Sequence, residues 1–178
     1  MRQLNAEQRM RTVFAANYGD VVRFVQRRTG PERAEDVAAE TFLVAWRRIE
    51  EMPVDPGDAR AWLFGVARNC LLNERRSERR RDGLAVRLAE HPAPTGAHDP
   101  ADVVAPRLDL AAAWRRLSDD DQEVLALAVF EQLSAQQAAL VLGTSAGAVR
   151  VRLSRARARL RTHLESPDLS SHSPEVSR

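Results

Sequence analysis

Six arginines and no acidic residue occur between residues 145 and 164. At about 100° per residue, the apolar side chains of this segment align along one side of a helix. A helix that reads DNA has this layout, because its apolar back anchors it, small or polar side chains face the base edges, and cations hold phosphates. We therefore predict a buried stripe of Val149, Leu153, Ala156 and Leu160, and DNA contacts by Arg150, Val151, Arg152, Ser154, Arg155, Arg157 and Arg159.

The residues before this segment predict a first, shorter helix and a tight turn. Ser134 is followed three positions later by Gln137, which is the spacing of a capping box. Gly143 then ends the helix, and Ser145 can cap the next one. Residues 133–163 are therefore typical of a helix-turn-helix. The alternative is an amphipathic helix with a solvated basic face, but such a face usually carries balancing acidic residues four positions away.

Composition indicates a globular protein of one or two small domains, with 178 residues of which 44% are hydrophobic. The N-terminal residues are polar and form no apolar signal core, and no apolar run approaches the roughly 20 residues of a membrane span. We therefore expect a cytoplasmic location and no direct membrane insertion. All 27 basic residues are arginine, which suits bidentate phosphate contacts and equally fits a GC-rich genome.

Few residues of the chain could support catalysis or hold a cofactor. Cys70 is the only cysteine, so no internal disulfide and no thiolate metal cluster can form. We interpret Cys70 as a packed hydrophobe, because it falls on the apolar side of a predicted helix. The four histidines are scattered, and no Ser/His/Asp set or glycine-rich phosphate loop is evident. We expect no metal, no cofactor, no small-molecule substrate and no enzymatic activity.

Helical periodicity throughout the chain predicts an all-α protein. A segment rich in Ala, Pro, Gly, His and Asp interrupts this pattern, which is typical of a flexible linker between two domains. The final residues are rich in Ser and Pro and are predicted to be disordered. The expected domains are 1–81 and 107–165, with linker 82–106 and tail 166–178. The expected helices cover roughly 6–28, 31–51, 59–81, 107–117 and 119–132, followed by the helix-turn-helix.

Several motifs resemble those of extracytoplasmic-function (ECF) sigma factors. Residues 33–46 (RAEDVAAETFLVAW) and 61–69 (AWLFGVARN), with the arginine cluster that follows, resemble region two of this family. Residues 117–125 (LSDDDQEVL) and 133–164 resemble region four. The resemblance implies a subunit that binds core RNA polymerase and recognises promoter DNA. Region four would bind the minus-35 element, and region two would bind the minus-10 element and help to open the duplex there.

Some positions depart from the family pattern. Asp120 and Asp121 stand where Arg or Gln is common, and Asn73 stands where Asp is common. Ala148 replaces a threonine whose hydroxyl suits a phosphate contact. These departures bear on the roles of single residues more than on the family.

The second predicted helix carries one charged strip around an apolar residue. At helical spacing, Asp36, Glu40, Leu43 and Arg47 share an exposed side, where a charged helical partner could dock. The resemblance implies that this partner is the coiled-coil clamp of the largest polymerase subunit. The alternative is a solvated surface whose acidic residues only complement the helix dipole.

The third predicted helix and the loop before it are implied by the resemblance to contact the minus-10 element. Asparagine can read base edges and arginine can hold phosphates, so we predict contacts by Arg60, Asn69, Asn73 and Arg76. In relatives, the loop that corresponds to residues 53–60 captures a flipped base of the non-template strand, at a cost in unstacking energy. The sequence does not indicate which loop residue lines that pocket. Trp46 and Trp62 are interpreted as core or half-core residues.

Two other classes of protein stay open at this point. A helix-turn-helix regulator could bind an operator without polymerase, although such proteins usually dimerise and no extra dimerisation helix is evident. An enzyme is the third class, and the residues offer no support for it. The resemblance also allows an anti-sigma factor as a partner, in addition to core RNA polymerase and promoter DNA.

Overall fold

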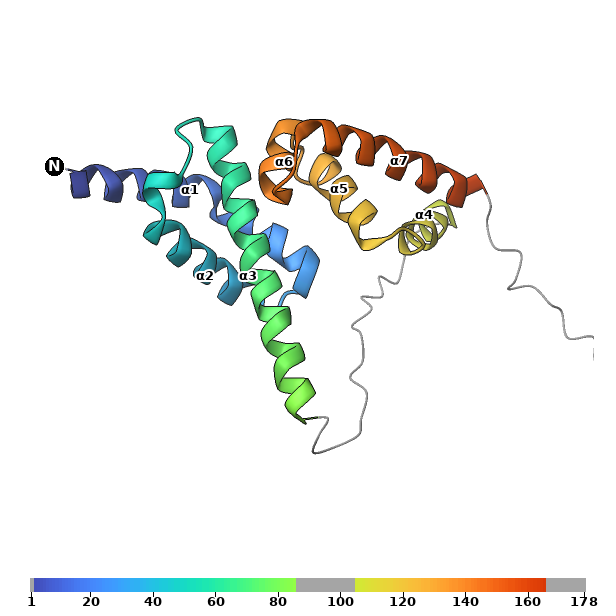
Figure 1. The fold of residues 1–178 in the computed structure, drawn as a ribbon, viewed down its shortest axis with the longest axis horizontal. Helices are drawn as coiled ribbons and strands as arrows, with labels where there is room; N and C mark the ends of the chain where they lie inside the picture. The colour runs from blue at the N-terminus through green and yellow to red at the C-terminus, as the bar shows by residue number, and fades with distance from the viewer. Residues whose placement is uncertain (1, 86–104, 166–178) are drawn as a thin grey trace, which may run out of the picture. The chain divides into compact units, whose positions relative to one another are not determined.

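The computed structural model describes residues 2–85 and 105–165, and every regular element in these ranges is a helix (Figure 1). The prediction of an all-α protein is therefore confirmed. Most of the predicted linker and the whole predicted tail lie outside the described residues. The helices are α1 (Arg2–Thr29), α2 (Ala34–Arg47), the 3₁₀-helix η1 (Ile49–Glu51), α3 (Pro56–Ala85), α4 (Ala105–Arg115), α5 (Asp119–Val129), α6 (Ala135–Leu142) and α7 (Ala146–Glu165).

The described residues form two units that are not contiguous in sequence. Helices α1, α2, η1, α3 and α6 belong to the first unit, and α4, α5 and α7 belong to the second. The predicted division into domains 1–81 and 107–165 follows chain order, and it stays a prediction.

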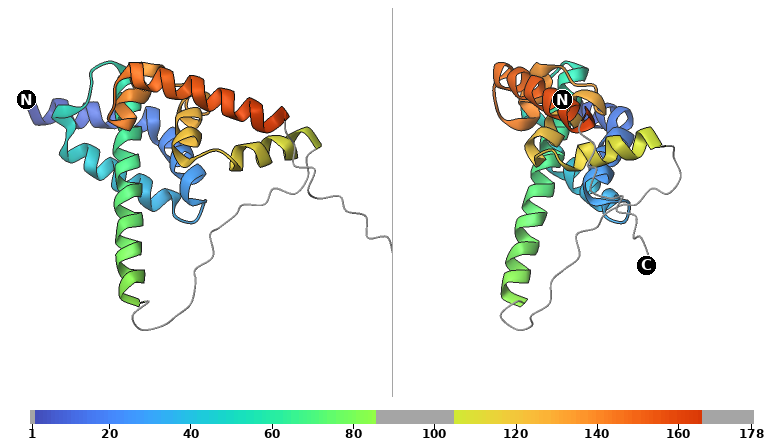
Figure 2. Two further views of the ribbon diagram at one scale, coloured as in Figure 1. Left: turned by 45° about the vertical axis from the view of Figure 1, so that its right-hand side comes forward. Right: turned by 90° about the vertical axis from the view of Figure 1, so that its right-hand side faces the viewer.

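The first unit has its core where α1, α2 and α3 pack against one another. The rings of Phe24 and Phe64 stack there with centroids 4.7 Å apart, and both side chains are fully buried. Helix α3 also packs against α6, and its C-terminal end extends well beyond α1 and α2 (Figure 2). The inward sides of α2 and α3 are formed by these buried residues: Val37, Ala38, Thr41, Phe42, Ala45, Leu63, Val66, Ala67, Cys70 and Leu71.

Burial of Cys70 determines the protonation state of its thiol. Desolvation raises the pKa of its thiol, and the negative charge of Glu40 adds to this effect. The thiol is therefore protonated at neutral pH, which agrees with the interpretation of Cys70 as a packed hydrophobe.

Trp46 differs from the expectation of a core or half-core residue, because 42% of its surface is exposed. Trp62 is half-buried, as expected.

Four helices begin at positions that differ from the prediction, among them α1 at Arg2 and α4 at Ala105, which both begin earlier than expected. Helix α2 begins at Ala34, a turn later than expected, because residues 31–33 form a turn in which the Ala34 amide donates to the Pro31 carbonyl at 3.3 Å. Helix α3 begins at Pro56, earlier than expected. Asp55 caps it by accepting a 2.9 Å hydrogen bond from the Asp58 amide, and Pro56 takes the first helical position, where its missing N–H costs nothing.

In the second unit, the corner between α4 and α5 is closed by side-chain hydrogen bonds. Ser118 accepts from the Asp121 amide at 3.3 Å and so caps α5. The Gln122 amide group donates to the carbonyl oxygens of Trp114 and Leu117 at 3.1 and 3.0 Å. These bonds satisfy the carbonyl groups that the end of α4 leaves open. No helix within residues 2–85 and 105–165 is both long and apolar enough to cross a membrane.

Candidate nucleic-acid interface

The start of α6 and the turn before α7 follow the local sequence signals. The Ser134 hydroxyl accepts from the Gln137 amide at 3.2 Å, and the Gln137 side chain accepts from the Ser134 amide at 3.1 Å. Both bonds of the predicted capping box are therefore present. Gly143 ends α6 with a φ of 63°, a left-handed conformation that disfavours any residue with a Cβ. Helix α7 then starts at Ala146.

Helix α7 has the apolar back that the sequence predicts. Val149 and Ala156 are buried, whereas Leu153 and Leu160 are half-buried, so the predicted stripe is only partly covered. On the opposite side of the helix, Ser154 and Arg155 are exposed, together with Val151 at 51%. This outward side offers a methyl-bearing side chain, a hydroxyl and a guanidinium, which are the groups that can read bases in a major groove.

The arginines of α7 fall on two edges that differ in their surroundings. One edge lines an open hollow of about 350 Å³, whose wall is formed by Arg150, Leu153, Ser154, Arg157, Ala158 and Arg161. Its three arginines form no salt bridge with another described residue. Because these cations lack an acidic partner there, they are suited to hold phosphates.

The other edge of α7 is paired with the first turn of α5. Arg159 contacts Asp121 at 2.5 Å, and Arg152 contacts Asp120 at 3.4 Å. Asp121 is only 3% exposed, so its carboxylate needs a charged partner to offset the cost of burial. The outer pair between Arg152 and Asp120 is far more exposed. Arg159 therefore holds α7 against α5 rather than projecting freely toward a ligand.

Helical spacing predicts neither this pairing nor which of the flanking arginines are left without an acidic partner. By spacing alone, the arginines on both sides of the stripe are equivalent candidates for DNA contact. The acidic run at residues 119–121 was a usable signal, because three carboxylates in one helical turn need cations nearby. Its meaning depended on a contact between residues 38 positions apart in the chain, which helical spacing does not reveal.

We predict different effects from removing an arginine on each edge of α7. Arg159→Ala leaves the buried Asp121 carboxylate unpaired and should lower the free energy of unfolding by about 1–3 kcal/mol. Arg161→Ala removes an exposed cation and should change it by less than about 0.5 kcal/mol. Urea titrations followed by circular dichroism measure both values. Equal stability of the two variants would show that the pair between Arg159 and Asp121 does not stabilise the unit.

The predicted minus-10 residues lie on two sides of α3. Asn69, Asn73 and Arg76 are exposed and share one side at spacings of four and three residues. Arg60 precedes Asn69 by nine positions, which places it about 180° around the helix. The structure therefore brings three of the four predicted residues together and separates Arg60 from them.

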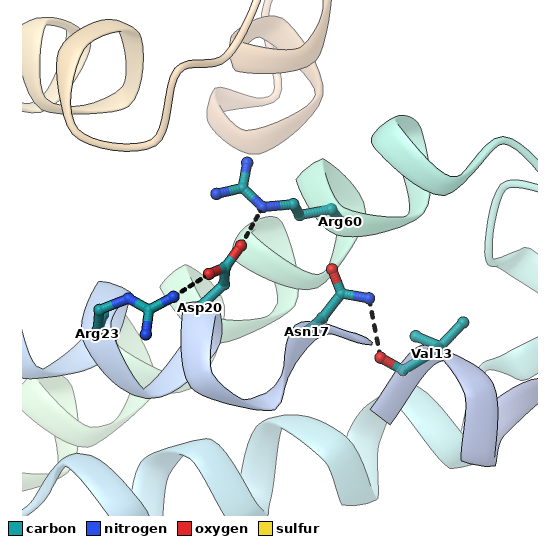
Figure 3. A network of polar contacts seen from close by, with 5 residues as sticks. All are labelled: Val13, Asn17, Asp20, Arg23 and Arg60. Atoms are coloured by element: carbon teal, nitrogen blue, oxygen red, sulfur yellow. Dashed lines mark hydrogen bonds and ion pairs between the residues drawn. The ribbon is translucent and has the colours of Figure 1, made fainter. Parts of the chain in front are cut away.

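Arg60 is held in the first unit by α1 (Figure 3). Its Nε donates to Asp20 at 2.5 Å, and its guanidinium lies 4.7 Å from the centroid of the Phe64 ring. Asp20 also pairs with Arg23, so two cations flank one carboxylate. Partial burial opposes the charged form of Asp20, but the hydrogen bonds and charges of Arg60 and Arg23 outweigh it and lower the pKa of this carboxyl. Arg60 is therefore paired with Asp20 of α1 near the N-terminal end of α3.

The loop between η1 and α3 is short and presents one apolar residue to solvent. Met52 is buried at its start, and Asp55 caps α3 at its end. Between them, Val54 is 90% exposed. The family resemblance implies that this loop captures a flipped base of the non-template strand.

The strip on α2 lies on the outside of the first unit. Asp36, Glu40 and Arg47 are exposed, and Leu43 is 60% exposed between them. The partly exposed Trp46 lies beside Leu43 on the same helix. The structure therefore brings all four predicted residues together on one solvent-facing side of α2.

Models of two sigma-factor regions match this chain in the expected order. Sigma-70 region 2 matches residues 13–81, and a sigma-70 region 4 model matches residues 107–160. Region 2 covers α1 to α3, and region 4 covers α4 to α7 up to Leu160. Two such regions in this order define the class of sigma-70-type sigma factors.

Similar proteins indicate which family of sigma-70-type factors this chain resembles. The chain is 34% identical to the ECF RNA polymerase sigma factor SigL of Mycobacterium tuberculosis, over 88% of this chain and 89% of that protein. It is 37% identical to the probable RNA polymerase sigma factor RfaY of Xanthomonas campestris, over 74% of this chain. It spans only 34% of the length of that second relative.

A solved structure adds a similar fold. The sigma factor RpoE from Bartonella quintana, in complex with the anti-sigma factor NepR, matches with a TM-score of 0.55 and 25% identity, over 90% of this chain and 97% of that one. The chain belongs to the ECF family of RNA polymerase sigma factors. Members of this class are known as non-catalytic transcription initiation factors.

Proposed function

We propose that this protein binds core RNA polymerase and directs it to promoters, where it starts transcription. The observation that supports this most directly is the presence of both sigma-factor regions in one chain, each with an exposed surface suited to its partner. The polymerase supplies the chemistry, so the protein itself acts without a catalytic step. A cytoplasmic location is part of the same proposal.

In this proposal, α7 reads the minus-35 element. Arg155, Val151 and Ser154 face outward and contact base edges, because they lie opposite the buried stripe. Arg150 and Arg157 hold phosphates from the open edge, and Arg161 joins them there. Arg152 and Arg159 act mainly by keeping α7 in place on α5, although both remain partly exposed to DNA.

The minus-10 element is assigned to α3 and the loop before it. Asn69, Asn73 and Arg76 form one exposed row that can contact bases and phosphates of the melted region. Arg60 supports the start of α3 through Asp20 instead of joining that row.

The exposed strip on α2 is the proposed binding surface for core RNA polymerase. Leu43 provides an apolar centre, and charged residues surround it, so a charged helical surface such as the clamp coiled coil fits there. An anti-sigma factor is a further proposed partner, because the related RpoE was solved in complex with one. Its binding would cover surfaces that the polymerase needs.

Run-off transcription with purified core polymerase and a library of genomic promoter fragments tests the proposal. We expect transcripts only when the protein is added, from fragments that share a pair of sequence elements upstream of the start. An absence of protein-dependent transcripts from every fragment would contradict it.

A further inference from the structure

One arginine of α1 holds the backbone of the loop that precedes α3. Nη2 of Arg9 donates to the carbonyl oxygens of Met52 and Pro53 at 2.6 and 2.8 Å. Nη1 of the same side chain lies 3.5 Å from the carbonyl oxygen of Ile49. A single guanidinium therefore gathers three carbonyl groups that are 40 to 44 positions away in the chain.

These carbonyl groups belong to Ile49, where η1 begins, to Met52, which caps its end, and to the first loop residue, Pro53. The end of a helix leaves carbonyl oxygens without partners, and a planar guanidinium with five donors can satisfy several at once. The contact is partly buried, so the bonds are less weakened by water than those of a surface arginine. Arg9 thus fixes the chain at the point where it leaves η1.

The other end of the loop is fixed as well. Asp55 accepts from the Asp58 amide at 2.9 Å, and the Ala59 amide donates to the Asp55 carbonyl at 2.8 Å. Only Val54 stands between the residue held by Arg9 and the residue that caps α3. The exposed tip of the loop is therefore held on both sides by specific bonds.

We infer that Arg9 is a positioning residue for capture of the melted minus-10 strand, because it holds the loop at residues 53–55 in the conformation that meets unpaired DNA. The inference rests on the proposed function. A loop that is already ordered loses little backbone entropy when a nucleotide binds, whereas a loose loop must be ordered at that moment. Arg9 itself acts through the backbone and need not touch DNA.

Three variants of the full-length protein, each assembled with core polymerase, test this role. Arg9→Gln removes the charge and the guanidinium fork. Arg9→Lys keeps the charge but cannot hold three carbonyl groups in the same geometry. Arg11→Gln is the matched control, since Arg11 lies on the same helix and pairs with Glu7 at the surface.

The probe is a single-stranded oligonucleotide of the non-template strand, taken from a promoter that gives a run-off transcript. We expect both Arg9 variants to bind it about ten-fold more weakly than the wild-type holoenzyme, and Arg11→Gln to bind within two-fold of wild type. Affinity for core polymerase and for a duplex minus-35 fragment should not change. Amide hydrogen exchange at Met52, whose N–H donates to the Ile49 carbonyl, should become faster in Arg9→Lys, while exchange in α2 stays the same.

Each other outcome overturns the inference in a distinct way. Wild-type binding by Arg9→Lys with loss in Arg9→Gln would show that charge alone matters. Unchanged binding by both would show that the loop needs no such support. Parallel loss of core and oligonucleotide binding would show a general folding role, and if Arg9→Gln does not fold, Arg9→Lys decides. A wild-type holoenzyme that neither binds the oligonucleotide nor transcribes would instead refute the proposed function.

Discussion

Reversing Asp36 and Glu40 together to arginine should weaken binding to core polymerase by at least about 100-fold, or about 3 kcal/mol. Both carboxylates project into solvent from one side of α2, so they do not contribute to the core. Two added cations on that side would face the basic groups that a complementary partner presents to the acidic strip. Helix content should stay nearly intact, because Val37, Ala38 and Thr41 remain buried on the opposite side.

The matched control for this reversal is the pair Glu32→Arg and Glu35→Arg. It makes the same change in net charge, but Glu32 precedes α2, and Glu35 in its first turn lies about 100° around the helix from Asp36. We expect the control protein to bind core polymerase within a few-fold of wild type. Pull-down with core enzyme and circular dichroism report the two properties separately. Undiminished binding by a folded Asp36/Glu40 variant would remove this surface from the mechanism.

Arg155→Ala should relax sequence preference at the minus-35 element and cost about 1–3 kcal/mol on the matched sequence. Arg155 is exposed on the side opposite the buried stripe. It also forms no ion pair with the acidic residues of α5, in contrast to Arg152 and Arg159. Its guanidinium is therefore available for a bidentate contact with a guanine. Loss of this contact should reduce the sequence preference at one base pair more than at the others.

Arg157→Ala is the comparison for this prediction. Arg157 lies on the open arginine edge and should contact phosphate, so its loss should weaken binding to all sequences evenly and reduce the salt dependence. Fluorescence anisotropy of the holoenzyme on matched and scrambled minus-35 duplexes measures both effects. Equal losses on the two duplexes for Arg155→Ala would assign it to phosphate instead of base contact.

The helices and their buried sides could be predicted from the sequence because they depend on local spacing. Val149 and Ala156 on α7, and Leu63 and Cys70 on α3, follow from a repeat of three or four residues. The capping box at Ser134 was predictable for the same reason, since both of its partners lie within one turn. The shared outward side of the residues on α2 also follows from helical geometry alone.

Other features of the site depend on contacts between distant parts of the chain. The guanidinium groups of Arg60, Arg9 and Arg159 each reach a partner about 40 positions away, and these contacts decide which arginines are available for DNA. Composition shows that arginines are abundant, but it does not show which carboxylate or carbonyl group each one meets. Arg60 and Arg159 were therefore predicted as DNA contacts on spacing and resemblance, whereas the structure gives them partners within the protein.

Gel shifts on one promoter fragment, with and without core polymerase, test the central claim most directly. Two small helical regions on one chain make few contacts each, so the free protein should bind weakly and lose that binding steeply as salt rises. With core polymerase we expect a specific complex that opens the duplex at the minus-10 element. Tight, sequence-specific binding by the purified protein alone, unchanged by core polymerase, would contradict this and indicate a stand-alone helix-turn-helix regulator.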